Sequence, residues 1–318
     1  MDDYRIPEQT EMGWVALRVA DLHAAIAFYG EAVGLMPASL PRIPAGAEGQ
    51  PGVALAVDRA SPPLVYLVAY PRAMPRPART SGLYHTAIRY PSRAGLAQAL
   101  RRMAVQQYPL GGAADHGVSE ALYTNDPDGN GVELYADRPR EEWTVEDGRV
   151  AMVTDPLDLD GLLDLVRGVR AEQSAPQGTA IGHMHLQVAN LARSRAFYHD
   201  LLGLDVTQES YPGALFLSAG GYHHHLGLNI WASRGAPPPP EGSLGLVAYS
   251  IRLPDEAGWQ ELVRRAEAAG VPLERGELDG SPLALLTDPD GMRVALVFSQ
   301  VPGAVEKRSG VPAARERR

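Results

Sequence analysis

An internal repeat is the feature that most constrains the fold of this chain. The segments 13–35 and 182–204 share one pattern, in which a glycine, a strand-like run, a Phe-Tyr pair and a Gly-Leu pair recur at the same spacings. Two segments that keep one register over about twenty residues indicate a repeated structural unit. The helix expected in each copy begins after a residue suited to an N-cap, Asp21 in the first and Asn190 in the second.

A second pattern adds two further copies. Segments 82–91 and 245–254 match each other, and each is followed by a helical pattern. Each copy then ends in the same Asp-Pro-Asp-Gly turn and a strand, with the turns at 126–129 and 288–291. The chain is therefore expected to hold four units of roughly 55–65 residues, each with a strand, a helix and several further strands. The four units are expected at residues 11–71, 80–138, 180–233 and 243–300.

The four units fall into two halves. A chain of 318 residues favours two domains, which we place at residues 1–155 and 179–300. Leucines recur among Asp and Arg between residues 155 and 170, so we expect residues 156–178 to form an amphipathic connecting helix and a linker. Residues 301–318 carry Gly and Pro and end in Arg-Glu-Arg-Arg, which predicts a poorly ordered tail.

Composition excludes several classes of protein. The net charge of -9 argues against a nucleic-acid surface, because no dense run of Lys and Arg is available to neutralise phosphates. The chain has no cysteine, which excludes disulfides, thiolate metal sites and cysteine nucleophiles and leaves 9 histidines and the carboxylates as metal ligands. The N-terminus lacks the apolar core of a signal peptide, and no apolar run is long enough to span a bilayer. A cytoplasmic protein is the expectation.

Three repeat-equivalent positions distinguish units two and three from units one and four. Units two and three carry two histidines and a carboxylate there, namely His85, His183 and Glu133. The other two units carry apolar side chains at the equivalent positions, namely Ala248, Trp14 and Ala295. A lone acid on a strand is by itself more often a solvent-facing residue than a ligand. A surface acid or a core histidine has no reason to follow this division between units, so we predict that the three residues act together.

Two imidazoles and one carboxylate leave one face of a bound metal open. This is the facial triad typical of non-haem Fe(II), whose open positions accept substrate and dioxygen. Zn²⁺, Mn²⁺ and Ni²⁺ use the same ligand types and remain alternatives.

The stretch from His116 to Glu133 carries a longer motif. It is expected to form a strand, a tight turn and a second strand that presents Glu133. The motif residues are Ala114, Asp115, His116, Leu122, Tyr123, Asp126, Pro127, Gly129 and Glu133. Together with the four units, this motif resembles the vicinal oxygen chelate (glyoxalase/bleomycin resistance/dioxygenase) superfamily, and within it the catechol 2,3-dioxygenase-type extradiol ring-cleavage dioxygenases. The resemblance covers nearly the whole chain outside the tail, and only Ala114 departs from the expected residue types.

The resemblance implies an α+β fold in which four βαβββ modules form two domains with cup-shaped mixed sheets. Many extradiol enzymes place both metal-binding units in the C-terminal half, whereas unit four of this chain has no ligand. The resemblance is therefore to members whose second and third units build the site together, with units one and four as the inactive partner.

The resemblance also implies roles for single residues beside the metal ligands. The family's acid–base catalyst corresponds to His224, with His225 as the main competitor. Strand alternation would put residue 224 on one face and residues 223 and 225 on the other. Without the resemblance, three consecutive histidines would be interpreted as a polar strand end.

Three further residues are expected at the site. His116 and Tyr123 correspond to groups that hydrogen-bond the substrate oxygens, although Tyr123 is also compatible with a core aromatic. His185, together with His225, is expected to line the substrate pocket, and a satisfied core histidine is the alternative for His185.

The implied activity is extradiol cleavage of a catechol-type substrate by O₂, giving a muconate semialdehyde-type product. Fe(II) is the favoured metal and Mn(II) the alternative. The expected partners are a small aromatic diol and O₂, and neither nucleic acid nor a membrane is expected. The protein is expected to be a homo-oligomer. One rival is a metal-dependent isomerase or lyase of the same superfamily, which draws ligands symmetrically from two units. The other is a non-enzymatic small-molecule binding protein. Leu228-Asn229-Ile230 gives unit three no last-strand carboxylate, which favours dioxygen chemistry over the first rival, and the triad argues against the second.

Overall fold

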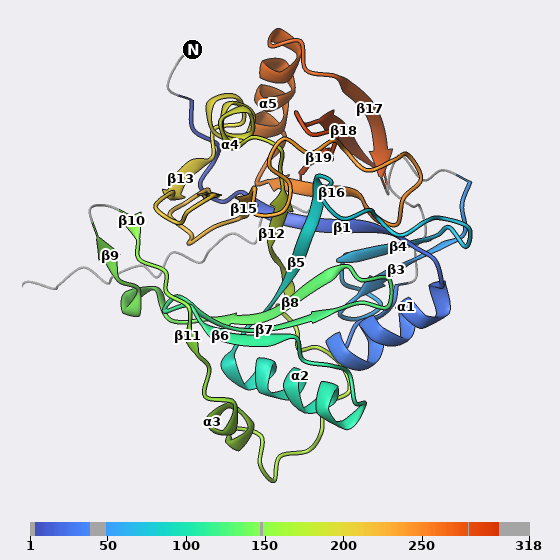
Figure 1. Ribbon diagram of the computed structural model, residues 1–318, viewed down its shortest axis with the longest axis vertical. Coiled ribbons are helices and arrows are strands. Elements are labelled where there is room, and N and C mark those ends of the chain that lie inside the picture. Colours follow the sequence, from blue (N-terminus) through green and yellow to red (C-terminus); the bar gives the residue numbers. More distant parts are fainter. Residues whose placement is uncertain (1–3, 39–48, 147–148, 279, 299–318) are drawn as a thin grey trace, which may run out of the picture.

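Two mixed sheets with helices packed against them form the described part of the molecule (Figure 1). The structure is a computed structural model and describes residues 4–38, 49–146, 149–278 and 280–298. Each of the four units contains a strand, a helix and three further strands, so the expected α+β fold with βαβββ modules is confirmed. The tail expected at residues 301–318 lies outside the described residues.

The elements follow the repeat. Unit one comprises β1 (Glu11–Val19), α1 (Leu22–Phe28), the π-helical turn η1 (Tyr29–Val33), β2 (Met36–Pro37), β3 (Gly52–Ala56) and β4 (Val65–Ala69). Unit two comprises β5 (Gly82–Tyr90), α2 (Arg93–Val105), β6 (Gly112–Asp115), β7 (Ser119–Asn125) and β8 (Gly131–Asp137). Unit three comprises β12 (Ala180–Gln187), α4 (Leu191–Arg195), the π-helical turn η3 (Ala196–Leu201), β13 (Asp205–Gln208), β14 (Ala214–Ser218) and β15 (Leu226–Asn229). Unit four comprises β16 (Gly245–Leu253), α5 (Glu256–Ala268), β17 (Leu273–Leu278), β18 (Ser281–Thr287) and β19 (Arg293–Phe298).

The segment between the halves forms short elements. These are the 3₁₀ turn η2 (Arg140–Glu142), β9 (Val145–Glu146), β10 (Arg149–Val150), β11 (Asp155–Pro156) and α3 (Leu159–Asp164). The connecting helix is thus shorter than the leucine pattern predicts. Asp158 caps its N-terminus through the amide of Gly161, and the chain leaves the helix in turns that reach Gly168 at a φ of 74°.

Each sheet takes one unit from each half of the sequence. The 8-stranded sheet has the order β17-β18-β19-β16-β1-β4-β3-β2, and the 9-stranded sheet has the order β11-β6-β7-β8-β5-β12-β15-β14-β13. The antiparallel pair β1/β16 joins units one and four, and the antiparallel pair β5/β12 joins units two and three. The predicted pairing of units is therefore confirmed, while the domain boundaries at residues 155 and 179 stay a prediction.

The Phe-Tyr pair and the Asp-Pro-Asp-Gly turn, two separate sequence motifs, meet in space. The Tyr29 hydroxyl of unit one donates to Asp126 at 3.4 Å, and the Tyr198 hydroxyl of unit three donates to Asp288 at 2.7 Å. Each aspartate also accepts backbone amides of its own turn. Burial raises the pKa of both carboxyls to about 6, against the hydrogen bonds that lower it. The two motifs thus fasten neighbouring units along the chain.

The helices bury one face each. Asp21 and Asn190 accept hydrogen bonds from helix amides, as expected of N-caps. Figure 1 shows α2 along one face of β6, β7 and β8, where Leu96 and Met103 are fully buried in the main hydrophobic core. No helix in the described residues is long and apolar enough to cross a membrane.

Candidate metal centre and its cavity

The candidate metal ligands stand on three adjacent strands at the centre of the 9-stranded sheet. Glu133 on β8 pairs with Ala87 on β5, and Ala87 pairs in turn with His183 on β12. The three side chains therefore share one row, and the small side chain of Ala87 leaves space between the other two. His85 lies two positions before Ala87 on β5 and faces the same side. Sheet register alone thus brings together residues that lie far apart in the sequence.

Two β-bulges adjust this register. The β5/β12 ladder shifts between Ile181 and His183, where Gly182 is the extra residue, and again where Tyr84 is the extra residue on β5. A Cβ atom at Gly182 would lie 1.7 Å from the Tyr135 hydroxyl, so only glycine fits there. Because of the second bulge, the consecutive residues Tyr84 and His85 both line the same cavity.

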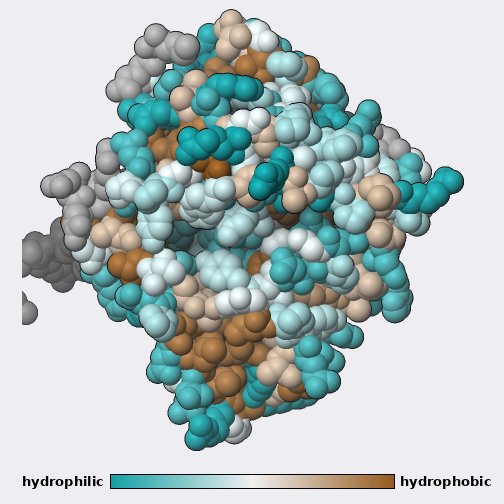
Figure 2. All heavy atoms as spheres, viewed as in Figure 1, coloured by the Kyte–Doolittle hydropathy of each residue, from teal (hydrophilic) through white to brown (hydrophobic). Residues whose placement is uncertain are grey.

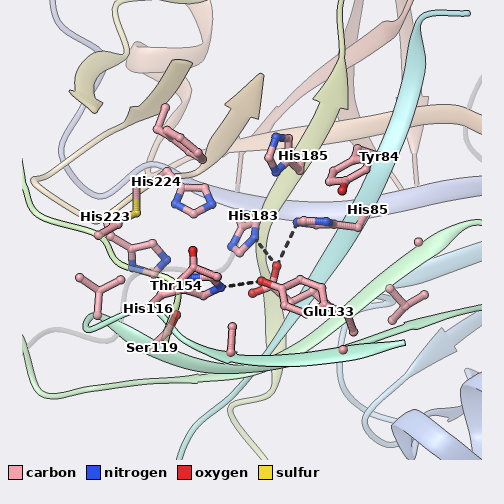
Figure 3. Close-up of a pocket in the computed structure, with 18 of the residues that line it drawn as sticks. Tyr84, His85, His116, Ser119, Glu133, Thr154, His183, His185, His223 and His224 are labelled. Atoms are coloured by element: carbon pink, nitrogen blue, oxygen red, sulfur yellow. Dashed lines mark hydrogen bonds and ion pairs between the residues drawn. The ribbon is translucent and has the colours of Figure 1, made fainter. Parts of the chain in front are cut away.

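The imidazoles of His85 and His183 approach the same carboxylate oxygen of Glu133. Nε2 of His85 lies 2.9 Å and Nε2 of His183 lies 3.1 Å from the same Oε2 atom of Glu133 (Figure 3). All three residues are buried, and their ligand atoms lie within 4.8 Å of one another. A glycine faces this cluster, since a Cβ atom at Gly131 would lie 2.2 Å from the backbone oxygen of Tyr84 and 3.0 Å from the Cβ atom of His85.

The electrostatics of the cluster match what a divalent transition metal requires. Burial raises the pKa of Glu133, but the two histidines outweigh burial and hold that pKa well below its usual range. Burial lowers the pKa of His183 against the opposing effect of Glu133. The ionised carboxylate of Glu133 and the neutral imidazole of His183 are the forms that bind metals, and His85 adds a second imidazole, so this donor set fits the predicted metal.

His116 and Tyr123 lie beside the cluster as a hydrogen-bonded pair. Nε2 of His116 lies 2.7 Å from the Tyr123 hydroxyl, and Nδ1 of His116 lies 2.7 Å from the carbonyl oxygen of Val153. A carbonyl can only accept, so Nδ1 carries the proton, and in the neutral ring Nε2 accepts from Tyr123. Tyr123 also pairs with Glu133 across β7 and β8, in the row that holds His183. The sequence motif thus folds into one wall of the cavity.

The three consecutive histidines do not form a strand. Residues 222–225 lie outside any strand, with bends at His223 and His225. Because β15 begins only at Leu226, the expected alternation over residues 223–225 is wrong. Both His223 and His224 line the cavity. His225 instead accepts the amide of Ala219 and lines a separate cavity of about 140 Å³, so the structure does not bring it to the predicted pocket.

His224 is the histidine of the bend that lies nearest a candidate ligand. Its ring centroid is 4.1 Å from that of His183 and 5.0 Å from that of Phe216. Burial, followed by the charges of neighbouring histidines, lowers the pKa of His224 well below its usual value. The ring is therefore neutral near pH 7 and can accept a proton. Its buried Nδ1 atom has no hydrogen-bond partner among the described residues.

His185 is packed into the wall of the cavity. It lies opposite Gly227 on β15, where a Cβ atom would come within 3.0 Å of the imidazole ring. Its ring centroid is 4.9 Å from that of His85 and 5.7 Å from that of Trp231. Burial, followed by the charges of His85 and His183, lowers its pKa well below the usual value. The structure thus places His185 at the pocket, as expected, although its ring is buried like that of a core residue.

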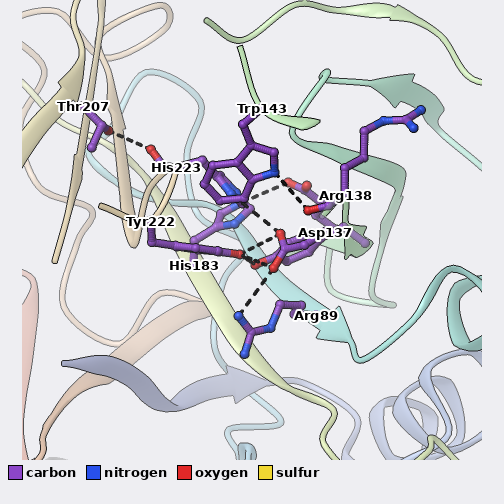
Figure 4. A network of polar contacts seen from close by, with 10 residues as sticks. Arg89, Asp137, Arg138, Trp143, His183, Thr207, Tyr222 and His223 are labelled. Atoms are coloured by element: carbon purple, nitrogen blue, oxygen red, sulfur yellow. Dashed lines mark hydrogen bonds and ion pairs between the residues drawn. The ribbon is translucent and has the colours of Figure 1, made fainter. Parts of the chain in front are cut away.

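A network behind the cavity holds the bend (Figure 4). The Tyr222 hydroxyl lies 2.7 Å from that of Tyr135 and donates to both carboxylate oxygens of Asp137, at 3.0 and 3.1 Å. Asp137 also lies 3.6 Å from Nδ1 of His223 and 3.5 Å from Arg89. Burial raises the pKa of Asp137 to about 6 although Arg89 lowers it. This network was not anticipated from the sequence, because no local pattern links its members.

The cavity next to the cluster measures about 500 Å³. Figure 2 shows the molecular face hollowed between the strands of unit three and those of unit two. The sequence did not point to several of its walls. Tyr84 comes from the bulge in β5, Phe216 from β14, and Tyr211 and Trp231 from loops on either side of unit three's last two strands. The segment after β10 adds Met152, Val153 and Thr154. No sequence signal marked these residues, since each reaches the cavity through tertiary contacts.

Comparison with known proteins shows the family to which the chain belongs. The profile of the Glyoxalase/Bleomycin resistance protein/Dioxygenase superfamily matches residues 11–134 and 180–296. The chain belongs to this superfamily. It is 41% identical over 276 residues to the catechol-2,3-dioxygenase of Bacillus subtilis strain 168, which covers 86% of this chain and 93% of that protein. The resemblance inferred from the motif is therefore confirmed.

Other proteins resemble part of the sequence or share the fold. The glutathione transferase FosA of Serratia marcescens is 30% identical over 118 residues, which covers 37% of this chain and 79% of that protein. A solved structure of a candidate dioxygenase from Bacillus subtilis subsp. subtilis strain 168 superposes with a TM-score of 0.64 at 11% identity, over 93% of this chain and 87% of that chain. Glyoxalase I of Zea mays gives a TM-score of 0.56 at 19% identity, over 91% and 92% of the two chains. These two structures show the shared fold.

The other sheet of this superfamily member is filled instead of hollow. The residues equivalent to the candidate ligands, Trp14, Ala248 and Ala295, all lie in one buried hydrophobic cluster. The Trp14 ring packs edge-on against Tyr66 with centroids 5.5 Å apart, and its amide donates to Ser250 at 2.8 Å. Apolar packing thus occupies the space that the polar cluster occupies in the first sheet.

Proposed function

We propose that this protein is an extradiol ring-cleaving dioxygenase that acts on a catechol-type substrate. The observation that carries the proposal is the convergence of His85, His183 and Glu133 beside a cavity that also holds the neutral imidazole of His224. The 41% identity to a catechol-2,3-dioxygenase supports the same activity. Fe(II) is the proposed metal and Mn(II) the alternative, because both accept two imidazoles and a carboxylate with open positions.

The metal and the protein have separate tasks. His85, His183 and Glu133 would hold a divalent metal, which would supply Lewis acidity toward two adjacent hydroxyl groups and the capacity to react with O₂. His224 stands at the same cavity and accepts a hydroxyl proton from the substrate. The Tyr123 hydroxyl donates a hydrogen bond to Nε2 of His116, and its oxygen can still accept one from the second hydroxyl of the substrate.

The donor set favours this reaction over an isomerase or lyase of the same fold. A site with ligands drawn symmetrically from two units would need a carboxylate on the last strand of unit three. That strand, β15, presents Gly227 to the cavity side of His185, and its remaining residues are Leu226, Leu228 and Asn229. Three donors leave more open positions on the metal than four.

Ring cleavage can be tested directly with purified protein. The protein is loaded anaerobically with Fe(II) or Mn(II), mixed with catechol and then exposed to air. The expected result is uptake of one O₂ per catechol with a yellow ring-fission product. A colourless product from cleavage between the hydroxyl carbons, or no product from any catechol, would contradict the proposal.

A further inference from the structure

Tyr84 and Trp231 form an aromatic rim at the opening of the cavity. Tyr84 is 42% exposed and Trp231 is 51% exposed, yet both line the cavity, so they stand where it opens to solvent. Their ring centroids are 5.7 Å apart, and each ring also packs against His185, at 5.0 Å for Tyr84 and 5.7 Å for Trp231. The bulge in β5 is what brings Tyr84 to this position beside His85 (Figure 3).

A second aromatic pair continues this surface inward. Phe216 on β14 lies between His185, at 5.8 Å, and His224, at 5.0 Å. Tyr211 packs against Phe216 and ties its hydroxyl to Thr154 at 3.0 Å across the cavity mouth. A continuous aromatic surface therefore runs from the candidate base to the solvent. Such surface favours flat or apolar groups, since it offers dispersion contact and little hydrogen bonding.

The described side chains that line the cavity carry no cationic group to bind an anion. Among the described residues around the cavity, Glu133 is the only acid and none is a lysine or an arginine. A substrate carboxylate at the rim would lose its hydration without gaining a cationic side-chain partner among these lining residues. The cavity of about 500 Å³ also lies in the range that holds drug-sized ligands, whereas catechol is a single ring.

We propose that the preferred substrates are catechols with a neutral, bulky apolar substituent, which the aromatic rim of Tyr84 and Trp231 contacts. This inference rests on the proposed function for the diol and adds the chemistry of the substituent. Tyr84 and Trp231 are assigned as specificity-determining residues, and they leave the diol end of the substrate to the metal centre.

Matched pairs of ligands separate charge from position. Binding of 3- and 4-tert-butylcatechol and of 2,3- and 3,4-dihydroxybenzoate is measured by anaerobic calorimetry on the metal-loaded protein, so that no turnover occurs. The tert-butyl compounds are expected to bind at least as tightly as catechol, and both acids roughly 100-fold more weakly than their tert-butyl partners. An acid that binds as tightly as its partner would overturn the inference. Failure of the proposed function would show separately, as absence of ring cleavage when air is admitted.

Variants at the rim test the residue assignment. Trp231→Ala is expected to weaken binding of the better tert-butylcatechol about tenfold more than it weakens binding of catechol. Trp231→Phe should restore most of this loss, because it keeps an aromatic surface without the hydrogen bond to Pro212. Val105→Ala, at an exposed position at the end of α2, serves as the control and should change neither. Equal losses for catechol and tert-butylcatechol in Trp231→Ala would count against the rim.

Discussion

At the scale of the residue, the properties of the site follow from burial and from neighbours within a few ångströms. Glu133 stays ionised in a fully buried position because two imidazoles lie at 2.9 and 3.1 Å from one of its oxygens. His224 stays neutral because it is buried among other histidines. One group is thereby kept ready to hold a cation and the other to accept a proton.

Removing the carboxylate charge is expected to empty the metal site. Glu133→Gln keeps the shape of the side chain but loses the anion, so Fe(II) affinity should fall at least about 100-fold. His85→Ala and His183→Ala should lose metal similarly, measured as iron per chain after anaerobic gel filtration. Asp164→Asn, an exposed carboxylate in α3, is the control and should bind iron like the parent protein. Stoichiometric iron and full turnover in any of the three site variants would refute the ligand set.

The proton acceptor is expected to be separable from the metal site. His224→Phe should keep iron but reduce kcat by roughly 10²–10⁴-fold, as is typical for loss of a general base. His225→Phe should retain most of the rate, because His225 lines the other cavity. Single-turnover cleavage of catechol measures both effects. A normal rate in His224→Phe would move the base to another group, with His223 the next at the cavity.

At the scale of the element, the turns and tyrosines that fasten the units make stability depend on pH. Asp288 accepts the Tyr198 hydroxyl at 2.7 Å, and Tyr249 donates to Tyr198 at 2.8 Å. The pKa of Asp288 in the folded state is about 6, above the ordinary 3.8. A raised folded pKa means that the native state holds the proton more tightly than the unfolded chain does, so the stabilisation is complete below about pH 4 and is lost as pH rises through 6.

Asp288→Asn should remove the share of this pH dependence that Asp288 contributes, whereas Asp126 and Asp137, whose pKa values are also about 6, keep theirs. The free energy of unfolding of the parent protein is expected to fall by up to about 3 kcal/mol more than that of the variant between pH 4 and pH 7. Urea unfolding midpoints across this range measure the difference. Parallel pH profiles for the two proteins would mean that the carboxyl is already ionised in the folded state at pH 4.

At the scale of the whole molecule, one sheet carries the polar site and the other carries apolar packing. Units two and three form the first sheet and units one and four form the second. The repeat-equivalent positions hold His85, His183 and Glu133 in the first sheet. In the second sheet they hold Trp14, Ala248 and Ala295. The second sheet therefore contributes to stability without contributing a side chain to the candidate metal cluster.

This division predicts that stability and activity separate. Trp14→Ala should destabilise the protein by about 3–5 kcal/mol, because a nearly fully buried indole leaves a cavity against Tyr66. Iron content and kcat below the unfolding transition should stay within about twofold of the parent values. Thermal unfolding and turnover measured on the same samples give both quantities. Loss of iron in folded Trp14→Ala protein would show that the two sheets are coupled.

The sequence by itself determined the four units, their pairing across the halves and the three side chains of the polar cluster. All of these follow from patterns that recur along the chain, since His85, His183 and Glu133 stand out only against Ala248, Trp14 and Ala295. The N-caps and the Asp-Pro-Asp-Gly turns are local as well, because the residues within a few positions set their conformation.

Tertiary structure alone decided which histidines of the 223–225 run reach the cavity, and what covers its mouth. The run bends because Tyr222 is held by Tyr135 and Asp137 from another half of the sequence. Tyr84 turns inward because a bulge arises where β5 pairs with β12. These outcomes depend on contacts between segments that are distant along the chain, and a local sequence pattern carries no record of such contacts.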